Sequence, residues 1–591
     1  MRPLVLALGL VKLVSAYQQV PFTAPSPTAL LSAEFNTFAL ELLDEWAVPG
    51  LSLGIVKVGN DGKLLTDFRG YGTAGKGRKV DQDTLFGIAS NSKAFTAAAV
   101  AHLVDQGKLS WEDKVTQLLP DLKFSDTFAN EQATPIDILS HRTGLPRHEH
   151  SYQLGETPKE FVQRISGLRP SAEFRAEWQY NNQMFVTAAY LVSELSGEPF
   201  TDFVSSTFFK PLNMTATTYT PLLDDTDAMK HLSSSFATLK NWTSVEIPYN
   251  FNATFDQLQL HAGAGGVVSS AQDLVKWLAF LIEQRKTVSG STTDGSLDTI
   301  LSPESVKRMT DGHMLQEVAS EWPETSAFNY GLGLRSFSYR GVQAINHGGD
   351  IPGFGTQLLW SFDRGIGVVA LCNADGTGNA VADVAAYRAF DELLRLDKID
   401  WNSRYREKYA VARAERVARI SSAFALSTAD VVPSDHLKSY IGTYHDYAYG
   451  NISVCPSPSS DYPSSTSLPI ACSALSQRLD GVLSTDDTPP PSPRALLVAA
   501  PGLFGISHLI LEHDAGESWK GVAASVFGGV EGREQGLLVY DGSGEIKVEL
   551  VEGKQVEVWG VWGAGPEVWR REKERRKEGM WGEPEVVFTR V

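Results

Sequence analysis

Ser90-Asn91-Ser92-Lys93, followed by an Ala-rich apolar run from Ala94, places a hydroxyl group and an amine one helical turn apart at the start of a predicted helix. Residues three positions apart lie on one face of a helix, so the two side chains are within reach of each other. A serine hydroxyl becomes a good nucleophile when a nearby base takes its proton, and Lys93 is such a base only while it is neutral. Burial and the positive end of the helix dipole both lower a lysine pKa. The stretch predicts an activated serine; the structural alternative is that Ser90 caps a core helix and Lys93 reaches solvent.

The composition limits the classes of function. With 591 residues, 42% of them hydrophobic and 10% aromatic, the chain is large enough for more than one packed core. A dispersed net charge of −18 argues against nucleic acid as a partner. Three cysteines exclude a disulfide scaffold and a multi-cysteine metal site. We expect no metal and no cofactor, since metal-motif spacing is lacking in His141, His148, Glu149 and His150.

The N-terminus has the pattern of an export signal. Arg2 precedes an apolar run over residues 4–10, and small residues at 14–16 offer a cleavage site, so we predict a signal peptide over residues 1–16. Lys12 interrupts this segment. The run is too short to cross a bilayer and no later segment is long enough, so we expect a secreted protein without a membrane span. Four sequons agree with secretion and are candidate glycosylation sites: Asn213, Asn241, Asn252 and Asn451.

Strand patterns stand at both ends of residues 17–400, and helical periodicity dominates between them, from Phe86 to about Leu278. The predicted strands are 50–58, 64–71, 342–345, 356–362 and 367–371, with a helix following over about 380–396. Strands from both ends of a helical block imply one antiparallel sheet with helices packed against it. We therefore predict an α+β fold for residues 17–400, an antiparallel sheet flanked by helices with a helical subdomain.

The character of the chain changes beyond that segment. Residues 401–430 are charged and helix-compatible, which predicts a connector. Residues 431–591 show short alternating runs separated by glycines, which predict a small β-sandwich or barrel. Within it, the Ser/Pro-rich stretch 456–493 has little apolar surface to bury and is expected to be a mobile insertion. Cys455 and Cys472 would pair in an oxidising compartment, leaving Cys372 as a buried thiol.

Two motif-like patterns lack the structural context that their chemistry requires. Gly50-Leu51-Ser52-Leu53-Gly54 fits a nucleophile elbow, but the strand pattern continues through that serine to Val58. Residues 70–75 fit a dinucleotide fingerprint, yet no helix follows them. We assign neither pattern a function.

Two distant stretches accompany Ser90 in a recognisable order. Tyr180-Asn181-Asn182 stands just before a predicted helix, and His347-Gly348-Gly349 stands at the end of a predicted strand. This triple resembles the serine β-lactamase and penicillin-binding-protein superfamily, in which S-x-x-K, Y-x-N and K-T-G or H-x-G line one cleft. The branch that it resembles contains class C β-lactamases, D-alanyl-D-alanine carboxypeptidases, esterases and D-aminopeptidases. Residues 140–146, 265–269 and 330–333 are similar too, so the resemblance covers about residues 30–400.

A second, shorter resemblance concerns the C-terminal segment. Tyr440-Ile441-Gly442-Thr443-Tyr444, followed by Tyr449-Gly450, is similar to the start of the lipocalin-like domain of some D-peptidases in this family. It implies a lipocalin-like β-domain over residues 431–591.

The resemblance implies an acyl-enzyme mechanism. Ser90 would attack an ester or amide carbonyl, and its proton would pass to Lys93, to Tyr180 or to both as a coupled pair. Asn182 would hydrogen-bond the substrate or Lys93. The backbone N–H groups of Ser90 and Asp350 would form the oxyanion hole, and Gly349 would lie against the bound substrate.

His347 marks a departure from the β-lactamase pattern. It replaces the lysine that would hold a substrate carboxylate, which removes a permanent positive charge at neutral pH. We therefore expect poor hydrolysis of β-lactams and activity resembling that of the esterase or D-aminopeptidase members.

These features predict a secreted serine hydrolase that acts on a small-molecule ester, an amide or a short peptide. One alternative is an acyltransferase on the same fold, in which an alcohol replaces water in the second step. Another is a non-catalytic binding protein that retains the cleft. The sequence leaves the oligomeric state open.

Overall fold

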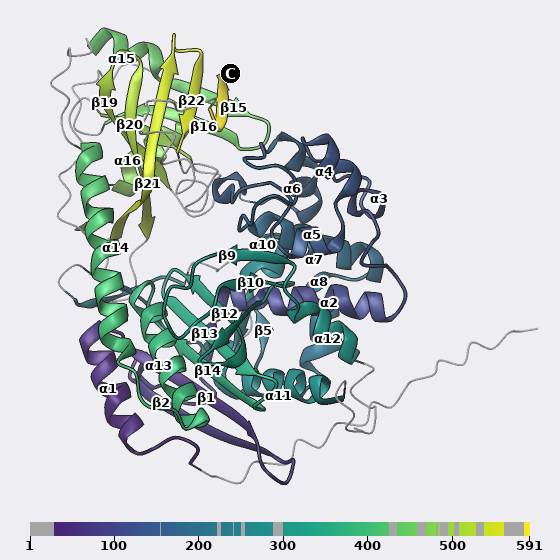
Figure 1. Ribbon diagram of the computed structural model, residues 1–591. Helices are drawn as coiled ribbons and strands as arrows, with labels where there is room; N and C mark the ends of the chain where they lie inside the picture. Colours follow the sequence, from purple (N-terminus) through teal and green to yellow (C-terminus); the bar gives the residue numbers. More distant parts are fainter. Residues whose placement is uncertain are drawn as a thin grey trace, which may run out of the picture.

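The computed structural model consists of an α+β domain and a smaller C-terminal β-domain, joined by the long helix α14 (Trp401–Phe424) (Figure 1). The described residues are 29–153, 155–220, 226–239, 242–249, 255–287, 300–424, 434–457, 468–479, 483–484, 495–500, 507–527, 537–560 and 584–591. The predicted signal peptide, 1–16, lies outside them.

The α+β domain is built on one nine-stranded sheet with the order β3-β2-β1-β14-β13-β12-β11-β10-β9. Its strands are β1 (Gly50–Val58), β2 (Leu64–Gly75), β3 (Arg78–Lys79), β9 (Met314–Glu317), β10 (Phe328–Tyr330), β11 (Arg335–Tyr339), β12 (Val342–Ile351), β13 (Phe354–Ser361) and β14 (Ile366–Cys372). β1 pairs antiparallel with β14 in the register Leu51 with Cys372, so both ends of the domain's segment meet in the sheet centre. This confirms the predicted fold class.

β12 is longer than predicted. The predicted strand ended at residue 345, but the strand continues to Ile351 because it keeps its pairing with β13. β11 pairs with residues 342–346 of β12, and this pairing ends at Asn346. Among the described residues, the β11-side edge of 347–351 therefore has no strand partner, and these five residues line a cleft.

Helices cover both faces of the sheet. α1 (Glu34–Trp46) and α13 (Thr377–Leu394) pack on one face. α11 (Ala271–Thr287) packs on the other face (Figure 1). There Trp277 contacts Phe95 of α2 (Lys93–Asp105). The close packing of α11 requires Gly54, because a side chain there would meet Val275 at 2.8 Å. The Gly-x-Ser-x-Gly pattern is thus a packing feature of a central strand.

The segment between the two halves of the sheet is mainly helical. Its helices and 3-10 turns are η1 (Ala89–Ser92), α3 (Val115–Leu118), α4 (Thr127–Gln132), α5 (Pro135–Leu139), η2 (Glu149–Ser151), α6 (Pro158–Arg164), η3 (Ile165–Gly167), α7 (Asn182–Ser196), α8 (Phe200–Val204), α9 (Thr226–His231), α10 (Phe255–Gly265) and α12 (Pro303–Thr310); a π-helical turn covers Ser205–Phe209. Short strands also occur: β4 (Phe86–Gly87), β5 (Thr218–Tyr219), β6 (Ser235–Thr238), β7 (Ser244–Ile247) and β8 (Val267–Ser269). The sequence did not predict them because two to four residues are too few to show a strand period.

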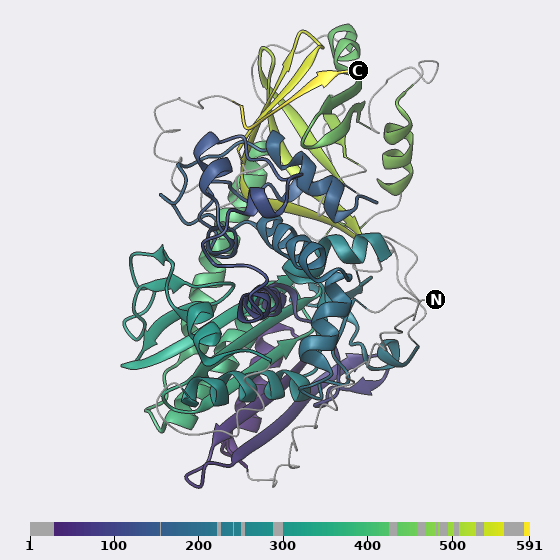
Figure 2. The same cartoon turned by 90° about the vertical axis from the view of Figure 1, so that its right-hand side faces the viewer.

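The C-terminal domain is a closed antiparallel barrel. Its elements are α15 (Ser434–Tyr440), β15 (Gly442–Asp446), β16 (Gly450–Pro456), α16 (Ile470–Leu479), β17 (Leu483–Ser484), β18 (Leu496–Ala499), β19 (His508–Ala515), β20 (Ser518–Phe527), β21 (Leu537–Val551), β22 (Gln555–Trp559) and β23 (Val586–Arg590). The strand order is β17-β21-β20-β19-β18-β16-β15-β23-β22, and pairing of β21 with β22 closes the ring. The predicted β-domain is therefore a barrel, and Figure 2 shows it against the helical part of the α+β domain.

The predicted disulfide between Cys455 and Cys472 is present and joins β16 to α16, while Cys372 is a buried free thiol. α16 lies inside the Ser/Pro-rich stretch 456–493 and buries Leu475 in a small apolar core. The expectation that this stretch buries little apolar surface is therefore wrong for residues 470–479, where Cys472 and Leu475 are buried. Residues 458–467, 480–482 and 485–494 lie outside the described residues.

Candidate active site

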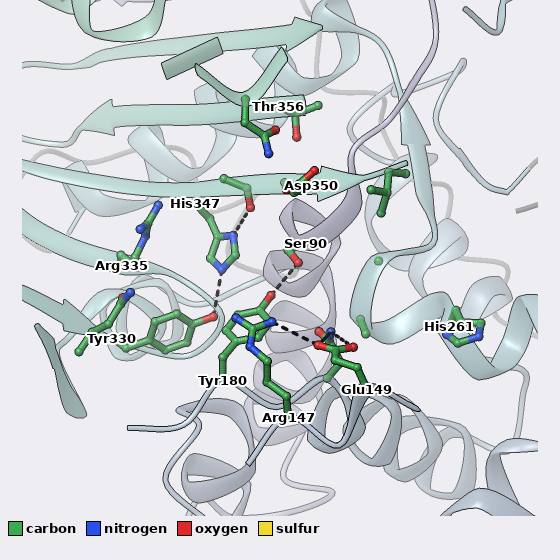
Figure 3. Close-up of a pocket in the computed structure, with 18 of the residues that line it drawn as sticks. Ser90, Arg147, Glu149, Tyr180, His261, Tyr330, Arg335, His347, Asp350 and Thr356 are labelled. Carbon is green, nitrogen blue, oxygen red and sulfur yellow. Dashed lines mark hydrogen bonds and ion pairs between the residues drawn. The ribbon is translucent and has the colours of Figure 1, made fainter. Parts of the chain in front are cut away.

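Ser90 lies in η1, immediately before α2, where the chain turns sharply. Ala89 has a positive φ of 49°, a conformation that is costly for a residue with a side chain. This turn carries the Ser90 side chain into a cleft between the helical segment and β12 (Figure 3). The predicted placement of the serine one turn before a helical lysine agrees with the structure, although a 3-10 turn precedes the α-helix.

Lys93 and Tyr180 both contact the hydroxyl oxygen of Ser90. Lys93 Nζ lies 3.1 Å from Ser90 Oγ. The Tyr180 hydroxyl donates to the same oxygen at 2.6 Å, and Figure 3 shows this bond. Tyr180 comes from the segment just before α7, 90 residues along the chain. The structure thus brings together the two candidate bases with the candidate nucleophile.

Lys93 is completely buried and forms no ion pair in the described part of the chain. Besides Ser90, its Nζ donates to the carbonyl oxygen of Ala264 at 2.7 Å. Burial holds the pKa of Lys93 well below its ordinary value; Glu149 opposes this shift and Arg147 adds to it. The structural alternative, a Lys93 that extends into solvent, is therefore wrong.

Tyr180 is also buried, but its pKa shifts in the opposite sense. Burial raises the pKa of the phenol well above its ordinary value, although the bond to Ser90 and the positive charge of Arg147 act against the rise. The Arg147 guanidinium lies 4.6 Å from the centre of the Tyr180 ring. The phenol is therefore a proton donor at neutral pH.

Asn182 begins α7 and contacts neither Lys93 nor Ser90 in the hydrogen bonds of the described residues. Its Nδ2 donates to both carboxylate oxygens of Glu149, at 3.0 and 3.2 Å. Glu149 in turn pairs with Arg147 at 3.2 Å. The bond to Lys93 that was one of the two expectations for Asn182 is absent here, because the neighbouring Asn181 caps α7 and Asn182 turns toward Glu149.

His347 lies at the far wall of the cleft, in a chain of three buried side chains. The backbone N–H of Asn181 donates to His141 Nδ1 at 3.1 Å, so His141 Nε2 carries the proton and donates to Tyr330 at 3.2 Å. The Tyr330 hydroxyl then donates to His347 Nε2 at 3.0 Å, and His347 Nδ1 donates to the carbonyl of Gly348 (Figure 3).

The surroundings of His347 keep it uncharged. Burial, followed by the positive charge of Arg335, holds the pKa of His347 well below its ordinary value. The residue that replaces the lysine of the β-lactamase pattern therefore supplies no positive charge at neutral pH.

The cleft has a volume of about 580 Å³, and Ser90, Tyr180, Asn182, His347, Gly349 and Asp350 all line it. Gly349 is required by packing, because a side chain there would lie 2.2 Å from the carbonyl oxygen of Ile88. This close approach sets the backbone of β12 beside the turn that carries Ser90. The candidate catalytic and substrate-binding residues thus line one cavity, except Lys93, which is buried and contacts the cavity residue Ser90.

Four charged residues of the cleft were not predicted as functional, namely Arg147, Glu149, Arg335 and Asp383. Arg335 begins β11, and its Nε has no hydrogen-bond partner among the described residues. Its charge was the available signal, but nothing in the sequence places residue 335 beside the His347 strand. Glu149 appeared only in a possible metal cluster; the described residues contain no cluster able to hold a metal ion.

Neither of the two glycosylation candidates among the described residues lines the cleft. Asn213 and Asn451 are exposed, whereas Asn241 and Asn252 lie outside the described residues. Among the described helices, none combines the length and apolar character needed to span a bilayer.

Comparison with known proteins agrees with this architecture. An unguisins hydrolase of Aspergillus campestris is 28% identical over 443 residues, covering 72% of this chain and 78% of the relative. A second unguisins hydrolase, from Aspergillus violaceofuscus, is 27% identical over 436 residues, covering 71% and 76%. The octameric penicillin-binding protein homologue from Pyrococcus abyssi has a similar fold, with a TM-score of 0.52 and 18% identity over 89% of this chain and 97% of its own.

A protein-family model described as Beta-lactamase matches residues 35–392, which include Ser90, Lys93, Tyr180 and His347. The match spans more than half of the chain and coincides with the α+β domain. The chain therefore belongs to the Beta-lactamase family.

Proposed function

We propose that the protein is a serine hydrolase that cleaves an ester or amide bond of a small molecule or short peptide through an acyl-enzyme on Ser90. The observation that carries this proposal is the position of Ser90 Oγ, within hydrogen-bond distance of both Lys93 Nζ and the Tyr180 hydroxyl. An activated nucleophile needs a base in contact with it, and the cleft provides one.

Lys93 is the base in this mechanism. Its lowered pKa gives a neutral amine that accepts the Ser90 proton, whereas the raised pKa of Tyr180 keeps the phenol protonated. As the proton leaves, Ser90 Oγ bonds to the substrate carbonyl carbon. Tyr180 then donates a proton to the departing alcohol or amine and regains one from Lys93. Water next attacks the acyl-enzyme, releasing the acid and restoring the Ser90 hydroxyl.

The developing oxyanion is held by backbone N–H groups of Ser90 and Asp350. Both residues line the cleft, on its helix side and its strand side respectively. Preorganised donors of this type contribute roughly 3 kcal/mol each to transition-state stabilisation. Gly349 allows β12 to come close enough for the strand to take part.

The cleft favours a small substrate, and this substrate does not need an anionic group that would bind at His347. Its volume of about 580 Å³ is in the range of small-molecule sites. The neutral state of His347 removes the charge that a β-lactam carboxylate would use, so β-lactams are expected to be poor substrates. Similarity to unguisins hydrolases supports hydrolysis as the reaction.

Labelling with a fluorophosphonate, followed by mass spectrometry of tryptic peptides, tests this proposal. We expect one adduct, located on Ser90, and hydrolysis of short-chain chromogenic esters or amino-acid amides that is lost in Ser90→Ala. A folded wild-type protein that neither labels at Ser90 nor hydrolyses any member of the panel would refute it and favour a binding role. Product formed only when an alcohol acceptor is added would identify an acyltransferase.

We further propose that the protein is secreted. The export pattern of residues 1–16 and the Cys455–Cys472 disulfide support this, since disulfides persist in oxidising compartments. Exposed Asn213 and Asn451 are the candidate glycosylation sites of the described residues. Sequencing the N-terminus of protein from the culture medium tests the proposal; retention in the cell with an intact N-terminus would refute it.

A further inference from the structure

A tight turn of the C-terminal barrel contacts the catalytic domain beside the cleft. This turn, residues 446–450 between β15 and β16, is held rigid by Asp446, whose Oδ1 accepts from the backbone N–H groups of Ala448 and Tyr449 at 2.8 and 2.9 Å. The Tyr449 hydroxyl lies 2.6 Å from His148 Nδ1 of the catalytic domain. Both of these side chains are 2% exposed, so the hydrogen bond is shielded from water.

The direction of this hydrogen bond follows from the other nitrogen of the His148 ring. His148 Nε2 lies 2.9 Å from the carbonyl oxygen of Arg169, which can only accept. Nε2 therefore carries the proton, Nδ1 accepts, and Tyr449 donates. Burial lowers the pKa of His148 to about 4, so this neutral form is the one present at neutral pH.

His148 is a constrained residue between two cleft residues. Its φ of 45° is unusual for a residue with a side chain, and its carbonyl accepts from Gln183 Nε2 of α7 at 2.6 Å. Arg147 and Glu149 flank it and line the cleft. The Tyr449 bond therefore anchors the middle of a three-residue segment whose ends face the substrate.

A second contact acts on the same segment. Arg164 of α6 donates to the carbonyl of Ala448 in the barrel turn and, at 3.0 Å, to the carbonyl of Ser151 at the end of η2. The barrel turn is thus linked to both ends of the Arg147–Ser151 segment. Tyr449 contacts His148 near its start, and Arg164 connects Ala448 to Ser151 at its end.

The flanking residues act on the proposed base. Arg147 lies over the Tyr180 ring, Glu149 is hydrogen-bonded to Asn182, and their charges have opposite effects on the pKa of Lys93. A small movement of this ion pair would change both the charge near Lys93 and the shape of the cleft.

We propose that Tyr449 is a positioning residue. Through its hydrogen bond to His148, the C-terminal barrel holds Arg147 and Glu149 in their positions in the cleft. The barrel is then a working part of the active site and not only an attached domain. This inference rests on the proposed hydrolase function for its kinetic readout, but the position of the segment can be measured without activity.

Tyr449→Phe tests the inference, and Tyr447→Phe is the matched control. Tyr447 belongs to the same turn and donates to the carbonyl of Gln163 at 3.2 Å, but it is 56% exposed and does not contact His148. We expect Tyr449→Phe to lower kcat/KM roughly threefold to tenfold, the usual effect of losing one buried hydrogen bond. Tyr447→Phe should leave it unchanged, and melting temperatures of both variants report their folding.

Glu149→Gln distinguishes positioning from general support of the fold. If Tyr449 acts through the ion pair, the effect of Tyr449→Phe on kcat/KM shrinks in the Glu149→Gln background. Hydrogen–deuterium exchange of peptides covering 147–151 should be faster in Tyr449→Phe than in Tyr447→Phe, and this readout also serves an inactive protein. If Tyr449→Phe does not fold, His148→Gln is compared in the same way.

Equal kinetics and equal exchange in the Tyr449→Phe and Tyr447→Phe proteins would overturn the inference. So would a kinetic effect of undiminished size in the Glu149→Gln background, which would mean that Tyr449 acts elsewhere. Failure of wild-type Ser90 to label, in contrast, refutes the proposed function and leaves the exchange test of the inference intact.

Discussion

Two lysines of the catalytic domain, Lys93 on α2 and Lys276 on α11, are both buried but have different partners. Lys276 Nζ pairs with Asp273 at 2.7 Å and donates to the carbonyl of Asn213. Among the described residues, the hydrogen bonds of Lys93 Nζ go to the hydroxyl of Ser90 and a carbonyl oxygen and to no carboxylate, and its pKa is held well below the ordinary value. A carboxylate partner makes a buried lysine a structural cation, and its absence makes the lysine a base.

The largest expected effect is on activity. Lys93→Met should lower kcat/KM by roughly a hundredfold to ten-thousandfold, because the base that takes the Ser90 proton is removed. Lys276→Met should retain wild-type kcat/KM in the fraction of protein that is folded. Steady-state kinetics with the best ester of the panel measure both; equal losses in the two variants would remove the distinction between the lysines.

Tyr180→Phe tests the role assigned to the phenol. Because the raised pKa keeps Tyr180 protonated, its loss removes a hydrogen bond to Ser90 Oγ and a proton donor, but not the base. We expect kcat/KM to fall roughly a hundredfold, the lower end of the range for loss of a general acid. The acid limb of the pH profile should remain; its disappearance in Tyr180→Phe would assign the base to the phenol.

The free energy of unfolding should change in opposite directions in Lys276→Met and Lys93→Met. Lys276→Met leaves Asp273 buried without its cation, at a cost of about 3 kcal/mol in the free energy of unfolding. Lys93 has a lower pKa folded than unfolded, so the unfolded state binds more protons at pH values between the two. Its contribution is therefore unfavourable at pH 7 and improves as the pH rises. Urea unfolding at pH 7 should show Lys93→Met to be more stable than wild type.

A smaller effect is expected for the buried histidine at the domain contact. The pKa of His148 is about 4 in the folded protein and near 6.5 when unfolded, so its contribution to stability is lost as the pH falls through this window. Urea unfolding at pH 7, 5.5 and 4.5 should therefore show a steeper loss for wild type than for His148→Gln. Parallel curves for the two proteins would contradict the assigned neutral state.

The local part of the site could be predicted from sequence, and the long-range part could not. Ser90 and Lys93 are one helical turn apart, so helix geometry alone places them together. Tyr180 and His347 were assigned to the same site only because their order along the chain resembled a family pattern. Arg335, Glu149 and Tyr449 reach the cleft or its border through strand register and domain contact. A periodicity argument contains no information about such pairings.

The fold shows the same division. The central strands were predictable because they are nearly continuous apolar runs, and α7 because its apolar residues recur at helical spacing. β12 extends beyond its predicted end because pairing with β13 outweighs the low strand preference of Gly348 and Gly349. α16 was missed because the disulfide at Cys472 and packing of Leu475 fix a helix within a Ser/Pro-rich stretch.

The pH dependence of fluorophosphonate labelling at Ser90 tests most directly whether an uncharged, unpaired Lys93 activates the serine. The second-order rate constant should rise with pH to a plateau, with a midpoint well below the 10.5 of an ordinary lysine, and this limb should vanish in Lys93→Met. A midpoint near 10.5, or an unchanged profile and rate in Lys93→Met, would contradict the account.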